Sequence, residues 1–191
     1  GGLKRERIGQ QHEEIDALNK RWKKFRILKG IESDILTDGR LDYDDDVLDR
    51  FDLVIASVHQ KLTMNEDEAT QRVVRAIEHP ACKVLGHPTG RLLLERPGYP
   101  LDMERVFDAC VANDCAVEIN ANCHRLDCDW RHLRRGKEKG VRFSIGPDAH
   151  SVDGLDHVRF GVGIARKGWL EPFDIINTMS VGALEKWAKQ R

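Results

Sequence analysis

Four side chains that can bind a metal ion stand directly after short apolar segments of this sequence. His59 follows one such segment, His87 follows the next, and the pair Asp148 and His150 follows a later one. Short apolar segments bounded by turn residues predict buried strands. Because the carboxyl ends of parallel strands point into a common region in α/β folds, these four side chains are expected to converge although they are far apart in the sequence.

A fifth candidate, Glu32, lies inside an apolar segment, between Ile31 and Ile35. A carboxylate in such a strand is costly to bury unless a cation or strong hydrogen-bond donors compensate it. Imidazole and carboxylate ligands together suit zinc, manganese or iron, and a bridging glutamate can hold two such ions. A lone histidine after a strand is more often an ordinary loop residue than a ligand. Several at successive strand ends, with Glu32 beside them, favour a metal site.

The cysteines offer a competing interpretation. Cys123, His124, Cys128 and His132 are close enough in sequence for a small zinc site, but their spacing matches no standard pattern and two aspartates interrupt it. The cysteine count, five, is odd, and no pair is separated by two residues. This usage favours reduced thiols and a cytoplasmic protein.

The elements that would position these residues alternate along the chain. Strands are predicted at 26–36, 53–58, 83–86, 116–120 and 141–145, with a possible sixth at 161–165. The predicted helices begin with an amphipathic one whose apolar stripe is Ile8, Ile15, Leu18 and Trp22. Others follow at 44–49, from the capping-box pair Asn65 and Glu68 to Ile77, at 101–113, at 129–139, and near Pro172 and Ser180. This alternation predicts a parallel sheet with crossover helices, either doubly wound or a barrel.

Composition limits the function classes. The 191 residues, 40% hydrophobic and 33% charged, suit one domain over 1–191. A net charge of −1 gives no overall attraction to nucleic acid, so any phosphate binding must come from a local patch or from bound cations. No apolar run is long enough to cross a membrane. The start at Gly1, without a methionine, suggests a piece of a longer protein.

Several motifs together resemble a known family. They are GIESDIL at 30–36, IASVH at 55–59, LGHPTGR at 85–91 and SIGPDAH at 144–150, and they are similar to the PHP (polymerase and histidinol phosphatase) domain. The phrases EINAN at 118–122, RLD at 125–127 and GVGIA at 161–165 resemble, more narrowly, the PHP domain of bacterial and archaeal family X DNA polymerases.

The resemblance implies a distorted barrel of seven strand-helix units with up to three Mn²⁺ or Zn²⁺ ions. It implies that Glu32 bridges two ions, that His59 and His87 complete one of those two sites, and that Asp148 and His150 serve the others. Glu32, Asp148 and His150 would be catalytic. The family's first ligands form a His-x-His motif, and none precedes Glu32 here. We therefore expect an incomplete barrel that lacks about two strand-helix units at its N-terminus, that is, an N-terminally truncated PHP domain.

The resemblance also implies an activity, namely hydrolysis of phosphate esters at DNA 3′ ends in DNA repair, as a 3′–5′ exonuclease or 3′-phosphatase. The implied partners are DNA and an upstream nucleotidyltransferase domain, and the piece alone is expected to be nearly inactive. Arg91 and Arg125 follow strand-end motifs and are candidate phosphate ligands, with a structural salt bridge as the alternative. Glu118 and Asn120 share one strand face and are candidates to support the ligands. Two other functions stay open: a stand-alone phosphatase of the histidinol-phosphate type and a non-catalytic domain that braces a polymerase.

Overall fold

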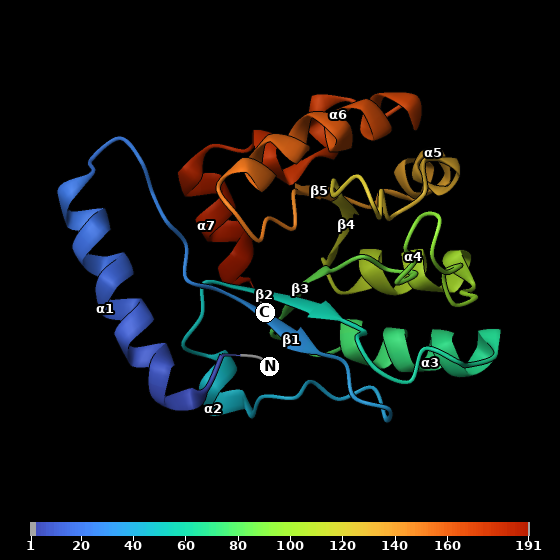
Figure 1. Ribbon diagram of the computed structural model, residues 1–191, viewed down its shortest axis with the longest axis horizontal. Coiled ribbons are helices and arrows are strands. Elements are labelled where there is room, and N and C mark those ends of the chain that lie inside the picture. Colours follow the sequence, from blue (N-terminus) through green and yellow to red (C-terminus); the bar gives the residue numbers. More distant parts are fainter. Residues whose placement is uncertain (1–2, 191) are drawn as a thin grey trace.

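Five parallel strands form one sheet, and they lie side by side in the order in which they occur in the chain (Figure 1). This computed structural model describes residues 3–190. The strands are β1 (Gly30–Asp34), β2 (Leu53–Ser57), β3 (Cys82–Leu85), β4 (Ala116–Asn120) and β5 (Phe143–Gly146). All five predicted strands are therefore confirmed, each within a few residues of its expected bounds.

Helices join and cover the strands. The α-helices of the described residues are α1 (Arg5–Arg21), α2 (Asp45–Leu48), α3 (Glu66–Ile77), α4 (Met103–Ala112), α5 (Trp130–Lys139), α6 (Val158–Lys167) and α7 (Val181–Lys189). Short 3₁₀ helices lie at η1 (Asp153–His157), η2 (Pro172–Asp174) and η3 (Ile176–Thr178). The predicted capping box begins α3, where the Asn65 side chain accepts from the Glu68 N–H at 2.9 Å. The fold is α/β with a parallel sheet, consistent with a partial barrel.

The two faces of the sheet have different coverings. Val54 and Ala56 of β2 belong to the main core, which α3 to α6 complete on one face. The alternate residues Leu53 and Ile55 pack instead against a smaller cluster centred on Trp187 of α7. The helix α7 therefore covers part of the opposite face. This alternation follows from the two-residue period of strand side chains.

The amino ends of the central strands are closed by α7. The Lys83 Nζ at the start of β3 donates to the Gln190 carbonyl at 3.0 Å and lies 4.9 Å from the centroid of the Trp187 ring. On the face that α7 covers, the amino ends of the strands are therefore packed against apolar groups. The polar side chains of that face lie at the carboxyl ends.

The predicted strand at 161–165 is wrong, because this segment lies inside α6. One glycine of this segment, Gly161, lets the helix approach the sheet closely. A Cβ at Gly161 would lie 2.6 Å from Ile145 Cγ2 and 2.8 Å from Ala121 Cβ. The burial of Gly161 and Ala165, four residues apart, has the helical period.

The predicted apolar stripe of the first helix is only partly confirmed. Ile8 is fully buried, and His12 on the same stripe packs edge-on against Phe51 with ring centroids 5.0 Å apart. Trp22 is 44% exposed, because the helix ends at Arg21 and the chain turns away from the protein there. Within the described residues, no helix combines the length and the apolar character that a membrane span requires.

The packing of α5 makes a testable contrast between two helical glycines. A Cβ at Gly136 would lie 2.7 Å from Phe143 Cζ and 3.2 Å from Phe107 Cζ, whereas a Cβ at Gly163 of α6 would meet no atom within 4 Å. We expect Gly136→Ala to lower the free energy of unfolding by about 1–2 kcal/mol through overpacking. Gly163→Ala should raise it by about 0.5–1 kcal/mol through helix propensity. Urea denaturation of both variants measures the difference, and stabilisation by both would contradict this packing.

Candidate metal centre

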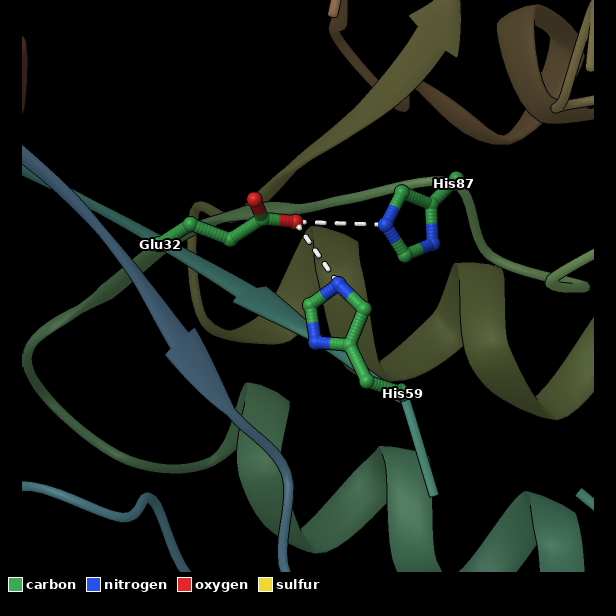
Figure 2. A group of neighbouring side chains, drawn as sticks. All are labelled: Glu32, His59 and His87. Atoms are coloured by element: carbon green, nitrogen blue, oxygen red, sulfur yellow. Dashed lines mark ion pairs between the residues drawn. The ribbon is translucent and has the colours of Figure 1, made fainter. Parts of the chain in front are cut away.

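Glu32, His59 and His87 come together at the carboxyl ends of β1, β2 and β3 (Figure 2). The Glu32 Oε1 atom lies 3.4 Å from His59 Nε2 and 3.2 Å from His87 Nε2. The two imidazole rings are nearly perpendicular, with centroids 5.1 Å apart. One ligand atom from each residue lies within 4.8 Å of the others, so a single ion can reach all three.

Strand pairing and one glycine create this convergence. In the register of β1 and β2, Glu32 pairs with Ile55, and the next pair on the same face is Asp34 with Ser57. Gly86 precedes His87, and a Cβ at Gly86 would lie only 2.2 Å from Ser57 Oγ. Only glycine lets the chain after β3 pass so close to β2. His87 then takes a positive φ of 22°, an uncommon conformation for a residue other than glycine.

The electrostatics of the cluster favour a cation. The neighbouring imidazole of His59, and next that of His87, lowers the pKa of Glu32 well below its usual range. Conversely, the pKa of His59 is raised to about 9, first by its hydrogen bond to Glu32 and also by Asp34, although burial opposes this. The raised pKa of His59 reports the negative potential that Glu32 and Asp34 create beside its ring. A divalent cation placed there would meet that potential.

Asp34 supports the cluster, and the sequence reasoning gave it no role. Its Oδ1 contacts His59 Nδ1, the ring nitrogen that faces away from Glu32. A carboxylate on the second nitrogen of a metal-binding histidine fixes the tautomer and the ring orientation. The signal was present in the sequence, because Asp34 is two residues from Glu32 and therefore on the same face of a strand.

The buried ring of His87 tests whether the site fits a metal. The residue is only 2% exposed. Within the described residues, neither ring nitrogen has a well-aligned hydrogen-bond partner, despite the nearby Glu32. Buried polar atoms without partners are costly and rare in native proteins. An ion bound to the exposed side of the cluster would satisfy Nε2. The donor set, two imidazoles and a carboxylate with an open position, is that of a catalytic-type metal site.

A cavity of about 360 Å³ joins this cluster to the end of β5. Glu118 on β4 is buried within it, and its Oε2 accepts the His87 backbone N–H at 2.8 Å. Burial raises the pKa of Glu118 to about 7. The neighbouring Asn120 donates to Asp148 Oδ2 at 3.1 Å. The residues lining the cavity are Glu32, Ile55, His87, Glu118, Asn120, Gly146, Pro147, Asp148, Ala149 and His150.

Asp148 and His150 thus share the cavity with Glu32 and His87, but they lie outside the group of three. The Asp148 Oδ2 atom is 3.2 Å from Arg125 Nε, so this carboxylate pairs with a guanidinium. The His150 side chain is 84% exposed, and its Nδ1 lies 2.9 Å from the backbone oxygen of Asp148. The structure therefore places all five candidate ligands at one end of the sheet and packs three of them closely together.

The two candidate phosphate-binding arginines lie in different surroundings. Arg125 pairs with Asp148, which lines the cavity. Arg91 donates instead to the Arg125 and Leu126 carbonyls and pairs with Asp129, so it fastens the loop that carries Arg125. Its guanidinium is bound by other groups of the protein, which agrees with the alternative expectation of a structural salt bridge.

The competing cysteine and histidine cluster does not assemble. Cys128 is fully buried whereas Cys123 is exposed. Among residues 3–190, the only group of three or more potential ligands close enough for one ion is Glu32, His59 and His87.

Comparison with known proteins agrees with the motifs. The chain is 43% identical over 189 residues to a protein of Bacillus subtilis (strain 168) named DNA polymerase/3′-5′ exonuclease PolX; the match covers 99% of this chain but 33% of that protein. The predicted resemblance to family X DNA polymerases is confirmed. Two proteins named probable phosphatase are also similar. One, from Thermoanaerobacter sp. (strain X514), is 27% identical, covering 86% of this chain and 69% of that protein.

The other, from Caldanaerobacter subterraneus subsp. tengcongensis, is 33% identical, covering 65% of this chain and 50% of that protein. No family model matches the chain. The polymerase and the phosphatases together are consistent with a PHP domain. The chain spans about a third of the polymerase relative.

Removing the charge that orients His59 should weaken metal binding without removing a ligand. We expect Asp34→Asn to raise the dissociation constant for Mn²⁺ or Zn²⁺ by roughly 10–100-fold. Isothermal titration calorimetry measures the constant. Asp38→Asn is the matched control, because Asp38 pairs with Arg40 on an exposed turn. An equal loss in both variants would contradict the orienting role of Asp34.

Loss of the buried ligand should have a larger effect. We expect His87→Ala to lower the number of tightly bound ions by about one, because three protein ligands are the minimum of a catalytic-type site. His124→Ala serves as the control, since His124 is exposed and belongs to the rejected cysteine cluster. Metal analysis after gel filtration gives the stoichiometry. A stoichiometry unchanged by His87→Ala would refute the ligand assignment.

Proposed function

We propose that this chain is part of a metal-dependent phosphoesterase domain that hydrolyses phosphate esters at DNA 3′ ends. The observation that carries the proposal is the cluster of Glu32 with His59 and the buried, unsatisfied His87. Its support from known proteins is the similarity to a DNA polymerase/3′-5′ exonuclease. The proposal includes Mn²⁺ or Zn²⁺ as the ion, a role in DNA repair, and a cytoplasmic location.

A divalent ion bound there would polarise a phosphoryl oxygen and lower the pKa of a bound water. The chain's own residues would do the rest. Asp34 holds the His59 ring in place, and Glu118 holds the backbone of His87. Arg125, beside Asp148 at the cavity, is placed to contact a phosphate oxygen through its guanidinium.

In this proposal the five strands belong to a seven-unit barrel, and up to three ions occupy the complete domain. Glu32, Asp148 and His150 would be its catalytic ligands. His150 is 84% exposed and lies outside the close group of Glu32, His59 and His87. Ions bound by Asp148 or His150 would therefore need further protein ligands. Those ligands and a nucleotidyltransferase domain would belong to a longer parent chain.

A second candidate, a phosphatase of small molecules such as histidinol phosphate, is favoured by the similarity to two probable phosphatases. The higher identity to the polymerase, 43% against 27% and 33%, favours the DNA substrate. The third candidate is a bracing domain without catalysis. It is disfavoured because Glu32, His59 and His87 still form a close group, with the Asp34 carboxylate behind His59.

The activity assay separates these candidates. We expect the 191-residue chain with Mn²⁺ to hydrolyse a 3′-recessed DNA primer only slowly, and a longer parent chain to hydrolyse it faster, because two ions are needed to stabilise the attacking and leaving oxygens. Glu32→Gln should abolish the activity of either chain. Faster turnover of histidinol phosphate than of DNA would favour the second candidate. Inactivity of both chains would favour the bracing domain.

A further inference from the structure

A second surface, remote from the metal centre, combines positive charge with exposed aromatic rings. It is the segment 20–26, with the sequence KRWKKFR, which includes the last two residues of α1 and the start of the connection to β1. Five of its seven residues are basic and none is acidic, in a chain whose net charge is −1. The other two, Trp22 and Phe25, are 44% and 64% exposed. We refer to residues 20–26 as the basic–aromatic loop.

The loop is held in a defined shape. The Asn19 side chain spans its base, donating to the Ile27 carbonyl at 2.9 Å and accepting the Ile27 N–H at 2.8 Å. At the carboxyl-terminal end of the loop, Arg26 pairs with Glu185 of α7 at 3.0 Å. Trp22 and Phe25 contact each other edge to face, with ring centroids 6.1 Å apart. A preorganised loop loses less entropy when it binds a ligand than a flexible one.

Most of the positive charge of the loop is available. Within residues 3–190, Arg21, Lys23 and Lys24 form no ion pair, whereas Arg26 is paired and Lys20 interacts with Asp16. Burying an aromatic ring normally stabilises the folded protein, yet Trp22 and Phe25 stay exposed to solvent among cations. This combination is the chemistry of proteins that bind single-stranded nucleic acid, in which bases stack on aromatic rings while lysine and arginine contact the phosphates.

We propose that the basic–aromatic loop is an anchoring site for single-stranded DNA, separate from the metal centre. The loop precedes the amino end of β1, whereas Glu32 and its partners lie at the carboxyl ends of the strands. In Figure 1, the arrows of β1 and β2 point away from the side of the molecule on which the loop follows α1. The choice of DNA rests on the proposed function. The loop would hold a strand at a distance from the end that is cleaved.

A membrane surface is the other common partner of basic and aromatic residues. Interfacial segments are helices with a continuous apolar face. The loop has no such face, since residues 22–26 are not helical, and the buried apolar residue of α1, Ile8, packs into the protein core. Charge complementarity and the stacking faces of both rings therefore favour the nucleic acid.

Binding can be measured without metal, so that it is independent of catalysis. In EDTA, the fluorescence anisotropy of fluorescein-labelled oligothymidylate should rise on addition of the 191-residue chain. We expect Trp22→Ala/Phe25→Ala to weaken binding roughly tenfold or more. Lys23→Glu/Lys24→Glu should also weaken binding, and should reduce the slope of log affinity against log salt by about 1.4.

The chain offers matched controls on and after α6. Arg166→Glu/Lys167→Glu makes the same charge change, and Trp169→Ala/Phe173→Ala removes two aromatic rings that are 71% and 94% exposed. We expect both controls to bind like the unmodified chain, with unchanged circular dichroism for all four variants. Equal loss in the controls, absence of binding by the unmodified chain, or stronger binding to phosphatidylserine vesicles than to oligothymidylate would overturn the proposal.

The metal-site variant separates this inference from the proposed function. His87→Ala should bind oligothymidylate like the unmodified chain, because His87 lies at the other end of the sheet. Binding without any hydrolysis in longer chains would leave the anchoring site standing and refute the phosphoesterase. Hydrolysis together with binding that the loop variants do not change would refute the anchoring site alone.

Discussion

The charge of the Glu32 carboxylate sets the arrangement of the whole carboxyl end of the sheet. It lies on an edge strand with an imidazole on each side, 3.2–3.4 Å away. Both rings approach the same carboxylate oxygen, and the buried His87 ring is left without a well-aligned partner. The surrounding groups are consequences of this constraint: Asp34 fixes one ring from behind, and Glu118 fixes the backbone that carries the other.

The sheet separates polar chemistry from packing along the length of its strands. At the amino ends, Trp187 of α7 packs on Val84 and Ala116, and the cations of Lys83 and Arg142 lie over its ring. At the carboxyl ends, the same face carries Glu118 and Asn120. Because both halves share one rigid sheet, the packing of α7 supports the position of the ligands without contacting them. The opposite face is the main apolar core, which gives the sheet its rigidity.

Two surfaces of opposite charge result from this layout. The metal centre is acidic and partly enclosed, and it suits a cation. The basic–aromatic loop is cationic and exposed, and it suits a polyanion. In a chain with a net charge of −1, such a separation places attraction for phosphate locally rather than over the whole surface. Arg125 is the exception, a cation that pairs with Asp148 at the border of the acidic site.

The sequence by itself determined the five strands and the position of the candidate metal ligands at their ends, because strand period, turn residues and capping signals are local properties. It also contained the motifs that the comparison confirmed. Tertiary structure alone decided which side chains meet. Asp34 reaches His59 through the pairing of β1 with β2, and Arg91 is used to fasten a neighbouring loop. The segment 161–165 is predicted as a strand but folds as part of α6, where Gly161 lies against Ala121 and Ile145. No local pattern reveals that contact. Contacts of this kind depend on where distant parts of the chain pack, and a sequence pattern carries only the period of each segment.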